Sequence, residues 1–207
     1  MRRLLCAAAR RQDRLKEFCI MPVYPITVAG LQRDLPICKV TDDLYIGAFI
    51  CFGDAELTVA CAREMLKLVD QDSYDYMLTA EAKSIPLIHE MARQAKAHRY
   101  CVARKRMKVY LGNALRTTVH SITTKGGQEL FLSEDEAKLM KGKRILIVDD
   151  VISTGESLRA LEDLVRQAEG IVCGRMSVLA EGDAAKRTDI QYLAPLPLFN
   201  ADGTPKV

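Results

Sequence analysis

The sequence contains no tryptophan, only three histidines and no two cysteines at Cys-x-x-Cys spacing. Its seven cysteines are an odd number scattered along the chain, a pattern that excludes a fully paired disulfide framework and a zinc ribbon. Several lie in apolar runs, where a free cysteine behaves as a small hydrophobic residue. A reducing, cytoplasmic location is therefore expected. The histidines, at positions 89, 98 and 120, lack the spacing of metal ligands.

Long hydrophobic runs are also missing. The N-terminal run from Leu4 to Ala9 is too short for the core of a signal peptide. No segment approaches the roughly 18 apolar residues of a membrane-spanning helix. We therefore expect a soluble protein that has no membrane partner.

Several common catalytic and phosphate-binding motifs are absent. The chain has no GxxxxGK[ST] loop for a nucleoside triphosphate, no GxGxxG dinucleotide fingerprint and no HExxH metal site. A Ser/His/Asp triad stays open, but no GxSxG elbow supports one. An anion site, if present, must be built in another way.

What the chain does have is an ordinary globular composition, with 207 residues, 49% hydrophobic and 28% charged. One domain with a small appendage is expected. The net charge of +3 is too small to indicate nucleic acid. Positive charge gathers in residues 1–16 and 103–108, which indicates either an anion-binding surface or a solvated basic face.

From Asp54 onward, helical and strand patterns alternate. Helical periodicity covers residues 54–69, with Asp54 as the cap, then 84–98, with Pro86 in the first turn, and 155–168. Short apolar strands are expected at 74–80, 100–104, 144–148 and 171–180, and residues 105–143 are expected to be irregular. This alternation predicts an α/β fold, with a parallel sheet flanked by helices.

The first 53 residues differ from the rest. Three prolines and a β-rich pattern over residues 35–40 and 44–52 predict a small N-terminal subdomain, the hood (residues 1–53). The α/β core spans residues 54–183. The proline-rich tail, residues 184–207, is expected to pack on the hood.

The segment "RILIVDDVISTGESLRAL" (144–161) carries the strongest functional signal. In open α/β sheets, ligands bind beyond the carboxyl ends of the strands. Ser153, Thr154 and Ser157 offer hydroxyl groups there, and Gly155 lets the backbone approach a ligand closely. With the N–H groups at the start of the next helix, they predict a phosphate site.

The adjacent carboxylates of Asp149 and Asp150 would repel that phosphate unless they had another task. A vicinal diol of a sugar offers one, since carboxylates accept hydrogen bonds from hydroxyl groups and stabilise positive charge that develops on the ring. In the simpler alternative, they only interact with the helix dipole. We therefore predict a ligand that carries both a sugar diol and a phosphate.

The stretch "ILIVDDVISTGES" (145–157) resembles the phosphoribosyl pyrophosphate (PRPP) motif of the type I phosphoribosyltransferases. "YMLTAEAKSIPL" (76–87) and "YCVARKRMKVY" (100–110) are similar to segments of the adenine and xanthine members. The resemblance covers about residues 54–182 and, more loosely, "VAGLQRDLPI" (28–37) in the hood. It implies a purine phosphoribosyltransferase, a glycosyltransferase of purine salvage with the type I core.

The resemblance also implies roles for individual residues. Asp149 and Asp150 would be catalytic and hold the ribose hydroxyls. The 5'-phosphate loop would comprise Val151, Ser153, Thr154, Gly155, Glu156 and Ser157. The pyrophosphate would meet Glu81, Ala82, Lys83, Ser84, Arg104 and Lys105. Mg²⁺ would be carried by PRPP without direct protein ligands, and the protein would be a homodimer. As alternatives, Glu81 caps a helix, and Arg104 and Lys105 form a solvated strand exit.

Residues 107–128 contain no acidic side chain, and the resemblance favours a mobile lid there over an ordinary hairpin. Adenine-specific members usually carry a lid glutamate where this chain has Thr124, and "ARKR" and "VHSITTK" look more like the xanthine type. The nucleobase is therefore left open. Phe49 and Phe52 could stack on it, although at alternating strand positions they are more often core residues.

A second hypothesis is a PRPP-sensing regulator of the same fold that has lost catalysis and touches nucleic acid through its basic N-terminus. The N-terminal region is too short for a winged-helix domain, and the net charge is low for a DNA-binding protein. Nucleic acid is therefore not expected as a partner.

Overall fold

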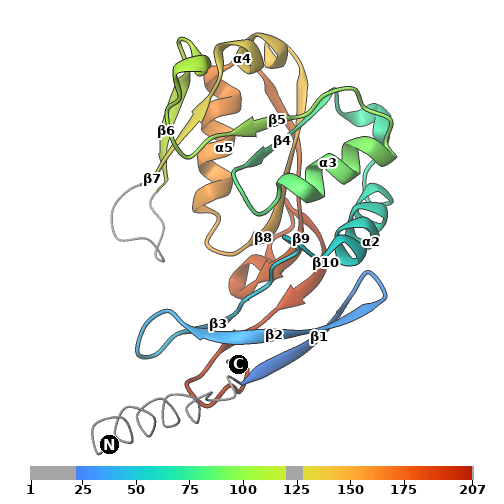
Figure 1. Cartoon of the computed structure of the whole chain (residues 1–207), viewed down its shortest axis with the longest axis vertical. Coiled ribbons are helices and arrows are strands. Elements are labelled where there is room, and N and C mark those ends of the chain that lie inside the picture. The colour runs from blue at the N-terminus through green and yellow to red at the C-terminus, as the bar shows by residue number, and fades with distance from the viewer. Residues whose placement is uncertain (1–21, 120–127, 207) are drawn as a thin grey trace, which may run out of the picture.

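A computed structural model describes residues 22–119 and 128–206 of the chain. A large parallel sheet lies between helices, and a smaller antiparallel sheet lies across one of its ends (Figure 1). The basic N-terminal cluster and Thr124 are outside the described residues.

The central sheet has five strands, all parallel, in the order β10-β9-β8-β4-β5. Their bounds are β4 Tyr76–Ala80, β5 Cys101–Ala103, β8 Arg144–Ile152, β9 Ile171–Glu181 and β10 Gln191–Leu196. The order reverses between β4 and β8. The predicted α/β class with a parallel sheet is confirmed.

Helices cover both faces of this sheet. α2 (Ala55–Leu66) and α3 (Ile85–Gln94) pack on one face, and α5 (Glu156–Gln167) and the short α4 (Glu134–Met140) contribute to the hydrophobic cluster on the other (Figure 1). Alternate residues of β8 enter the two clusters, Leu146 and Val148 on the α2 side and Ile145 and Ile147 on the α5 side. This alternation explains why a strand buried on both faces reads as a continuous apolar run.

The N-terminal sheet is antiparallel, in the order β1-β2-β3-β11. Its strands are β1 Val23–Val28, β2 Leu31–Lys39, β3 Tyr45–Gly47 and β11 Leu198–Phe199. The C-terminal segment therefore supplies one strand to the large sheet and one to the small sheet.

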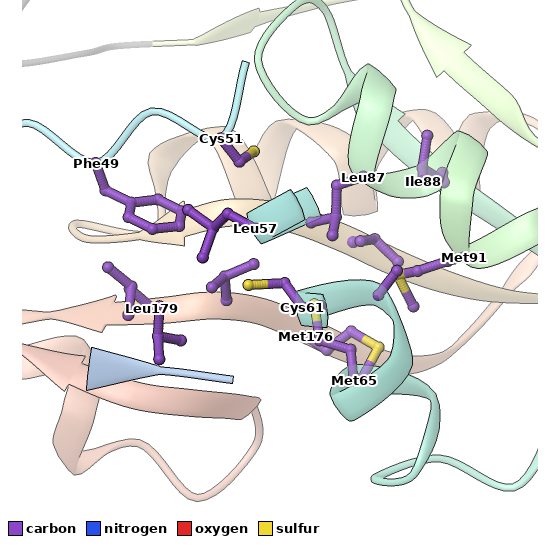
Figure 2. Close-up of a cluster of buried hydrophobic side chains, with 14 of the residues drawn as sticks. Phe49, Cys51, Leu57, Cys61, Met65, Leu87, Ile88, Met91, Met176 and Leu179 are labelled. Atoms are coloured by element: carbon purple, nitrogen blue, oxygen red, sulfur yellow. The ribbon is translucent and has the colours of Figure 1, made fainter. Parts of the chain in front are cut away.

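The small sheet shares its hydrophobic core with the α2 side of the large sheet. Figure 2 shows Phe49, from the segment after β3, beside Leu57 of α2, with Leu179 of β9 close to both. Cys51 lies in the same cluster. The small sheet and the α/β core are thus packed as one body.

The expectation of an irregular stretch over residues 105–143 is wrong. β6 (Leu115–Val119) and β7 (Gln128–Leu132) form an antiparallel pair, and α4 follows. α4 begins with a capping box, in which the Ser133 hydroxyl accepts from the Glu136 N–H at 3.2 Å. The described ends of the expected lid therefore form a two-stranded ribbon.

Some element bounds also differ from the expectation. Helical periodicity predicted a helix over residues 54–69, but α2 ends at Leu66, so Leu68 lies beyond the helix and is 40% exposed. β8 continues to Ile152, because its ladder with β9 runs on to the pair Ile152–Ala180. Asp149 and Asp150 therefore lie within the strand, three and two residues before its end, and not after it.

Three short 3₁₀ turns complete the described chain, at Gln71–Ser73, Val109–Leu111 and Gly182–Lys186. Within residues 22–119 and 128–206, no helix has the length and apolar character needed to cross a membrane.

Candidate functional site

The candidate site lies where the order of the central sheet reverses. After β4 the chain moves through α3 to β5 on one side, and after β8 it moves through α5 to β9 and β10 on the other. The loops that leave β4 and β8 therefore diverge and leave a crevice at the carboxyl edge of the sheet. Every site segment predicted from the sequence leaves one of three adjacent strands, β5, β4 or β8.

The carboxylate pair, Asp149 and Asp150, lies near the carboxyl end of strand β8. Asp150 is buried, and Asp149 is partly accessible. Burial, together with the neighbouring Asp150 charge, raises the pKa of Asp149 to about 8. One oxygen of Asp150, Oδ2, is buried and has no hydrogen-bond partner among the described residues. A buried acceptor without a partner is costly unless a ligand donates to it.

The predicted phosphate loop follows directly. Gly155, within it, is the N-cap of α5, and its last two residues, Glu156 and Ser157, begin the helix. Gly155 has a left-handed φ of 79°, and a Cβ atom there would lie 2.8 Å from Nη1 of Arg187. Both observations explain why a glycine occupies this position. Gly155 has no side chain to cap α5, and the side-chain contact at the helix start is a long one of 3.4 Å, from the Glu156 N–H to the Thr154 hydroxyl, so the first N–H groups are available to an anion.

The loop after β4 contains Glu81, Ala82, Lys83 and Ser84, and the peptide bond between the first two is cis. Oε2 of Glu81 accepts a hydrogen bond of 2.8 Å from the N–H of Lys105, which fastens this loop to the exit of β5. Glu81 therefore does not cap α3, whose N-cap is Ser84. The alternative role for Glu81 is wrong.

Two adjoining cavities connect these segments, one of about 210 Å³ and one of about 350 Å³. All six residues of the predicted phosphate loop line the first cavity. The second is lined by Asp149, Asp150, the four loop residues after β4, and Lys105. Of the predicted site residues, Arg104 alone lines neither cavity. Its backbone pairs with that of Phe131 in β7, through hydrogen bonds of 2.7 and 2.8 Å.

Glu181, the last residue of β9, also lines both cavities, and the sequence analysis missed it. Burial raises the pKa of its carboxyl group, and a hydrogen bond with Ser153 partly offsets that rise. An acidic residue at the end of an apolar strand, directly before Gly182, was a usable signal. The rule that ligands bind at the carboxyl ends of strands applies to it as much as to Asp149.

Residues 46–50, in and after β3, close the second cavity from the side of the small sheet. Phe49 is only 2% exposed and belongs to the hydrophobic core, although it borders this cavity. Phe52 is 58% exposed and lines neither cavity. Ile46, which lines both cavities, was not singled out in the sequence.

Within the described part of the chain, no three His, Cys, Asp or Glu side chains are grouped as a metal site. The oxygen donors of Asp149 and Asp150 nonetheless suit a ligand that brings its own hydrated Mg²⁺, a cation that prefers oxygen and keeps several waters.

Comparison with known proteins identifies a single family over most of the chain. Residues 55–191 match the family model of the phosphoribosyl transferase domain. The hypoxanthine/guanine phosphoribosyltransferase of Methanotorris igneus is 33% identical over 125 residues, which cover 60% of this chain and 64% of that protein. The xanthine phosphoribosyltransferase of Bacillus licheniformis is 28% identical over 142 residues, which cover 68% of this chain and 71% of that protein.

The fold is shared with solved structures. The adenine phosphoribosyltransferase from Thermoanaerobacter pseudethanolicus superimposes with a TM-score of 0.60 at 20% identity, covering 87% of this chain and 99% of that one. The expected type I core with an additional N-terminal sheet is therefore confirmed as a fold.

Proposed function

The chain belongs to the phosphoribosyltransferase family, and on this premise we propose that it transfers ribose 5-phosphate from PRPP to a purine base and releases pyrophosphate. The observation that supports this reaction most directly is the common lining of the two cavities. A carboxylate pair, a hydroxyl-rich loop at a helix start and a lysine-bearing loop meet there. PRPP carries a matching diol, monophosphate and pyrophosphate.

The 5'-phosphate lies at the start of α5, where the free N–H groups and the hydroxyls of Ser153, Thr154 and Ser157 donate to it. Asp149 and Asp150 accept hydrogen bonds from the ribose hydroxyls. Lys83 and Lys105, both exposed at the rim of the second cavity, neutralise the pyrophosphate together with the Mg²⁺ that PRPP carries.

The reaction breaks the bond between C1 of the ribose and the pyrophosphate oxygen, and a ring nitrogen of the base forms the new bond to C1. Positive charge develops on the sugar ring as pyrophosphate leaves with the electron pair. The carboxylates stabilise this positive charge in their ionised form, and Lys83 and Lys105 stabilise the leaving pyrophosphate. Purine salvage, a homodimer and a cytoplasmic location accompany this proposal as predictions.

The experiment that tests this function is pyrophosphate release by the full-length chain from PRPP and Mg²⁺. It is measured with adenine, hypoxanthine, guanine, xanthine, uracil, cytosine and orotate in turn, and without a base. We expect release that depends on one or more of the purines. Release with a pyrimidine only would contradict the purine assignment. No release with any base, despite tight PRPP binding, would contradict the enzyme and favour the PRPP-sensing regulator.

We propose further that Glu181 helps to select the base. A carboxylate beside the phosphate loop repels phosphate, so it suits the uncharged part of the substrate, and it accepts hydrogen bonds from amino or ring N–H groups. Ile46, which also lines both cavities, offers an apolar surface to the ring.

Replacing Glu181 with glutamine is expected to lower kcat/KM for the preferred base about 10- to 100-fold, because a hydrogen bond to a charged group is worth roughly 1.5–3 kcal/mol. PRPP affinity should change little. The matched control is Asp183→Asn, since Asp183 is a nearby acid whose side chain is 93% exposed. Equal activity of Glu181→Gln and wild type on all bases would exclude this role.

A further inference from the structure

Ser84 makes contacts that its assignment to the pyrophosphate loop does not explain. Its side chain is 1% exposed and points across the crevice from the β4 side to the β8 side. The hydroxyl lies 2.7 Å from Oδ1 of Asp149 and 3.2 Å from Oδ1 of Asp150. It also accepts a hydrogen bond of 2.9 Å from the N–H of Asp150. One hydroxyl group thus contacts both members of the carboxylate pair.

The helix gains no cap from this side chain. Ser84 is the N-cap residue of α3, a position where a serine hydroxyl normally accepts from the N–H groups of the first helical turn. Here the hydroxyl makes no capping bond, and Pro86 removes one of the N–H groups that it could have capped. The contacts with Asp149 and Asp150 replace the cap, so local helix formation does not account for the serine.

The contacts also divide the carboxylate oxygens into two sets. Ser84 occupies Oδ1 of both aspartates, and the Asp150 N–H donates to Oδ1 of Asp149 at 2.9 Å. Oδ2 of Asp150 is buried and has no partner among the described residues. Oδ1 of each aspartate therefore has a hydrogen-bond donor from the protein, whereas Oδ2 of Asp150 still lacks the donor that a sugar hydroxyl would supply.

We propose that Ser84 is a positioning residue that holds Asp149 and Asp150 with one oxygen each turned toward the ribose of PRPP, and so links the pyrophosphate loop to the ribose site. The inference rests on the proposed function and deepens it. The loop after β4 that binds pyrophosphate is also the loop that carries the hydroxyl group orienting the carboxylates. Binding of the leaving group and orientation of the sugar are thereby coupled through a single side chain.

The arrangement has a consequence for pH dependence. Ser84 donates to ionised Asp149, so it stabilises the charged form and counteracts the rise of the Asp149 pKa that burial and Asp150 cause. The other charged or titratable groups around this pair are Glu81, Lys83, Lys105, Glu181 and the buried Cys51 thiol. Loss of the hydroxyl leaves all of these groups in place. It removes the donor to Asp149 and one acceptor of the Asp150 N–H, which still donates to Oδ1 of Asp149.

The test compares Ser84→Ala with wild type in the dependence of kcat/KM for PRPP on pH, which reports groups in the free enzyme. We expect the acid limb to move up by about one to two pH units, the equivalent of one lost hydrogen bond to a charged group. Ser84→Thr, which keeps a hydroxyl, should restore the limb toward wild type. The matched control is Thr58→Val, which removes a hydroxyl at a site 6% exposed that borders neither cavity.

A second readout does not depend on turnover. The titration of the Asp149 carboxyl carbon, followed by NMR with labelled aspartate, should have a higher midpoint in Ser84→Ala than in wild type. An unchanged midpoint and an unchanged acid limb would overturn the proposal, even if Ser84→Ala lost activity through a packing defect. Absence of pyrophosphate release by the wild type would instead contradict the proposed function and leave the NMR comparison to decide the role of Ser84.

Discussion

Replacement of both site carboxylates, Asp149→Asn with Asp150→Asn, is expected to reduce kcat/KM for PRPP by about 10²- to 10⁴-fold. Each aspartate contributes a hydrogen bond to a ribose hydroxyl, and bonds that involve a charged group are worth roughly 1.5–3 kcal/mol each, or about one to two powers of ten in rate. Asparagine has nearly the same shape but carries no charge, so it cannot stabilise positive charge on the sugar ring. The measurement is pyrophosphate release with the preferred base at varied PRPP concentration.

A loss of activity is informative only if the variant folds. The pKa of Asp149 predicts how its replacement changes the stability of the fold at each pH. In the folded chain this pKa is raised from its usual value to about 8, so the native state holds a proton that the unfolded chain has already released above about pH 4. The stability of the wild type therefore falls as pH rises from about 4 to about 8. The single variant Asp149→Asn lacks this penalty.

Urea unfolding should accordingly show Asp149→Asn to be more stable than wild type above pH 8, with a difference that shrinks as the pH is lowered toward 4. An inactive variant with increased stability would indicate that the carboxylate is kept for function at a cost to the fold. Near-normal activity of the double variant would contradict the role assigned to the two aspartates. An Asp149→Asn variant less stable than wild type at alkaline pH would contradict the raised pKa of Asp149.

Replacement of Phe199 by alanine is expected to lower the free energy of unfolding by about 3–5 kcal/mol, the usual loss for a large aromatic residue in a core. Phe199 is fully buried in β11, where it pairs with Tyr45 of β3. Its ring meets that of Tyr24 edge-on, with centroids 5.0 Å apart. The side chain therefore joins the C-terminal segment to the N-terminal sheet that closes the second cavity.

The loss should be measured as a shift of the urea midpoint at constant slope. Phe52→Ala is the matched control, because its ring is 58% exposed and its loss should change stability by no more than about 0.5 kcal/mol. If Phe199→Ala fails to fold, Phe199→Leu, which keeps most of the apolar volume, should fold with a loss of about 1–1.5 kcal/mol. Equal stabilities of Phe199→Ala and Phe52→Ala would show that the tail does not pack as described.

The parts of this fold that the sequence predicts well are those with a strong local pattern. The α5 segment has Leu158, Leu161, Leu164 and Val165 on one face, and all four are buried. Pro86 lies in the first turn of α3, and Asp54 caps α2 by accepting from the Leu57 N–H at 3.0 Å. Each of these features depends on residues within one or two turns of each other, so no tertiary contact is needed to infer them.

The elements that the sequence predicts wrongly, α4 and the end of β8, also have physical explanations. α4 was overlooked although Ser133 and Glu136 form a capping box, because a helix of seven residues shows too few turns for periodicity to be visible. The end of β8 was placed too early because Asp149 and Asp150 look like the start of a loop. In the folded chain, β9 continues beside them as far as Glu181, and an adjacent strand supplies hydrogen bonds that no local propensity reveals.

By itself, the sequence determined the α/β class and singled out the candidate phosphate loop and the carboxylate pair, because strand alternation, helix caps and the run from Asp149 to Ser157 are all local in the chain. Only the tertiary structure decided that Ser84 reaches the carboxylates and that Glu181 borders both cavities. It also showed that Arg104 borders neither. The physical reason is sequence separation: Ser84 lies 66 positions from Asp150, and their contact exists only because the sheet order places β4 beside β8 with both carboxyl ends at the same edge.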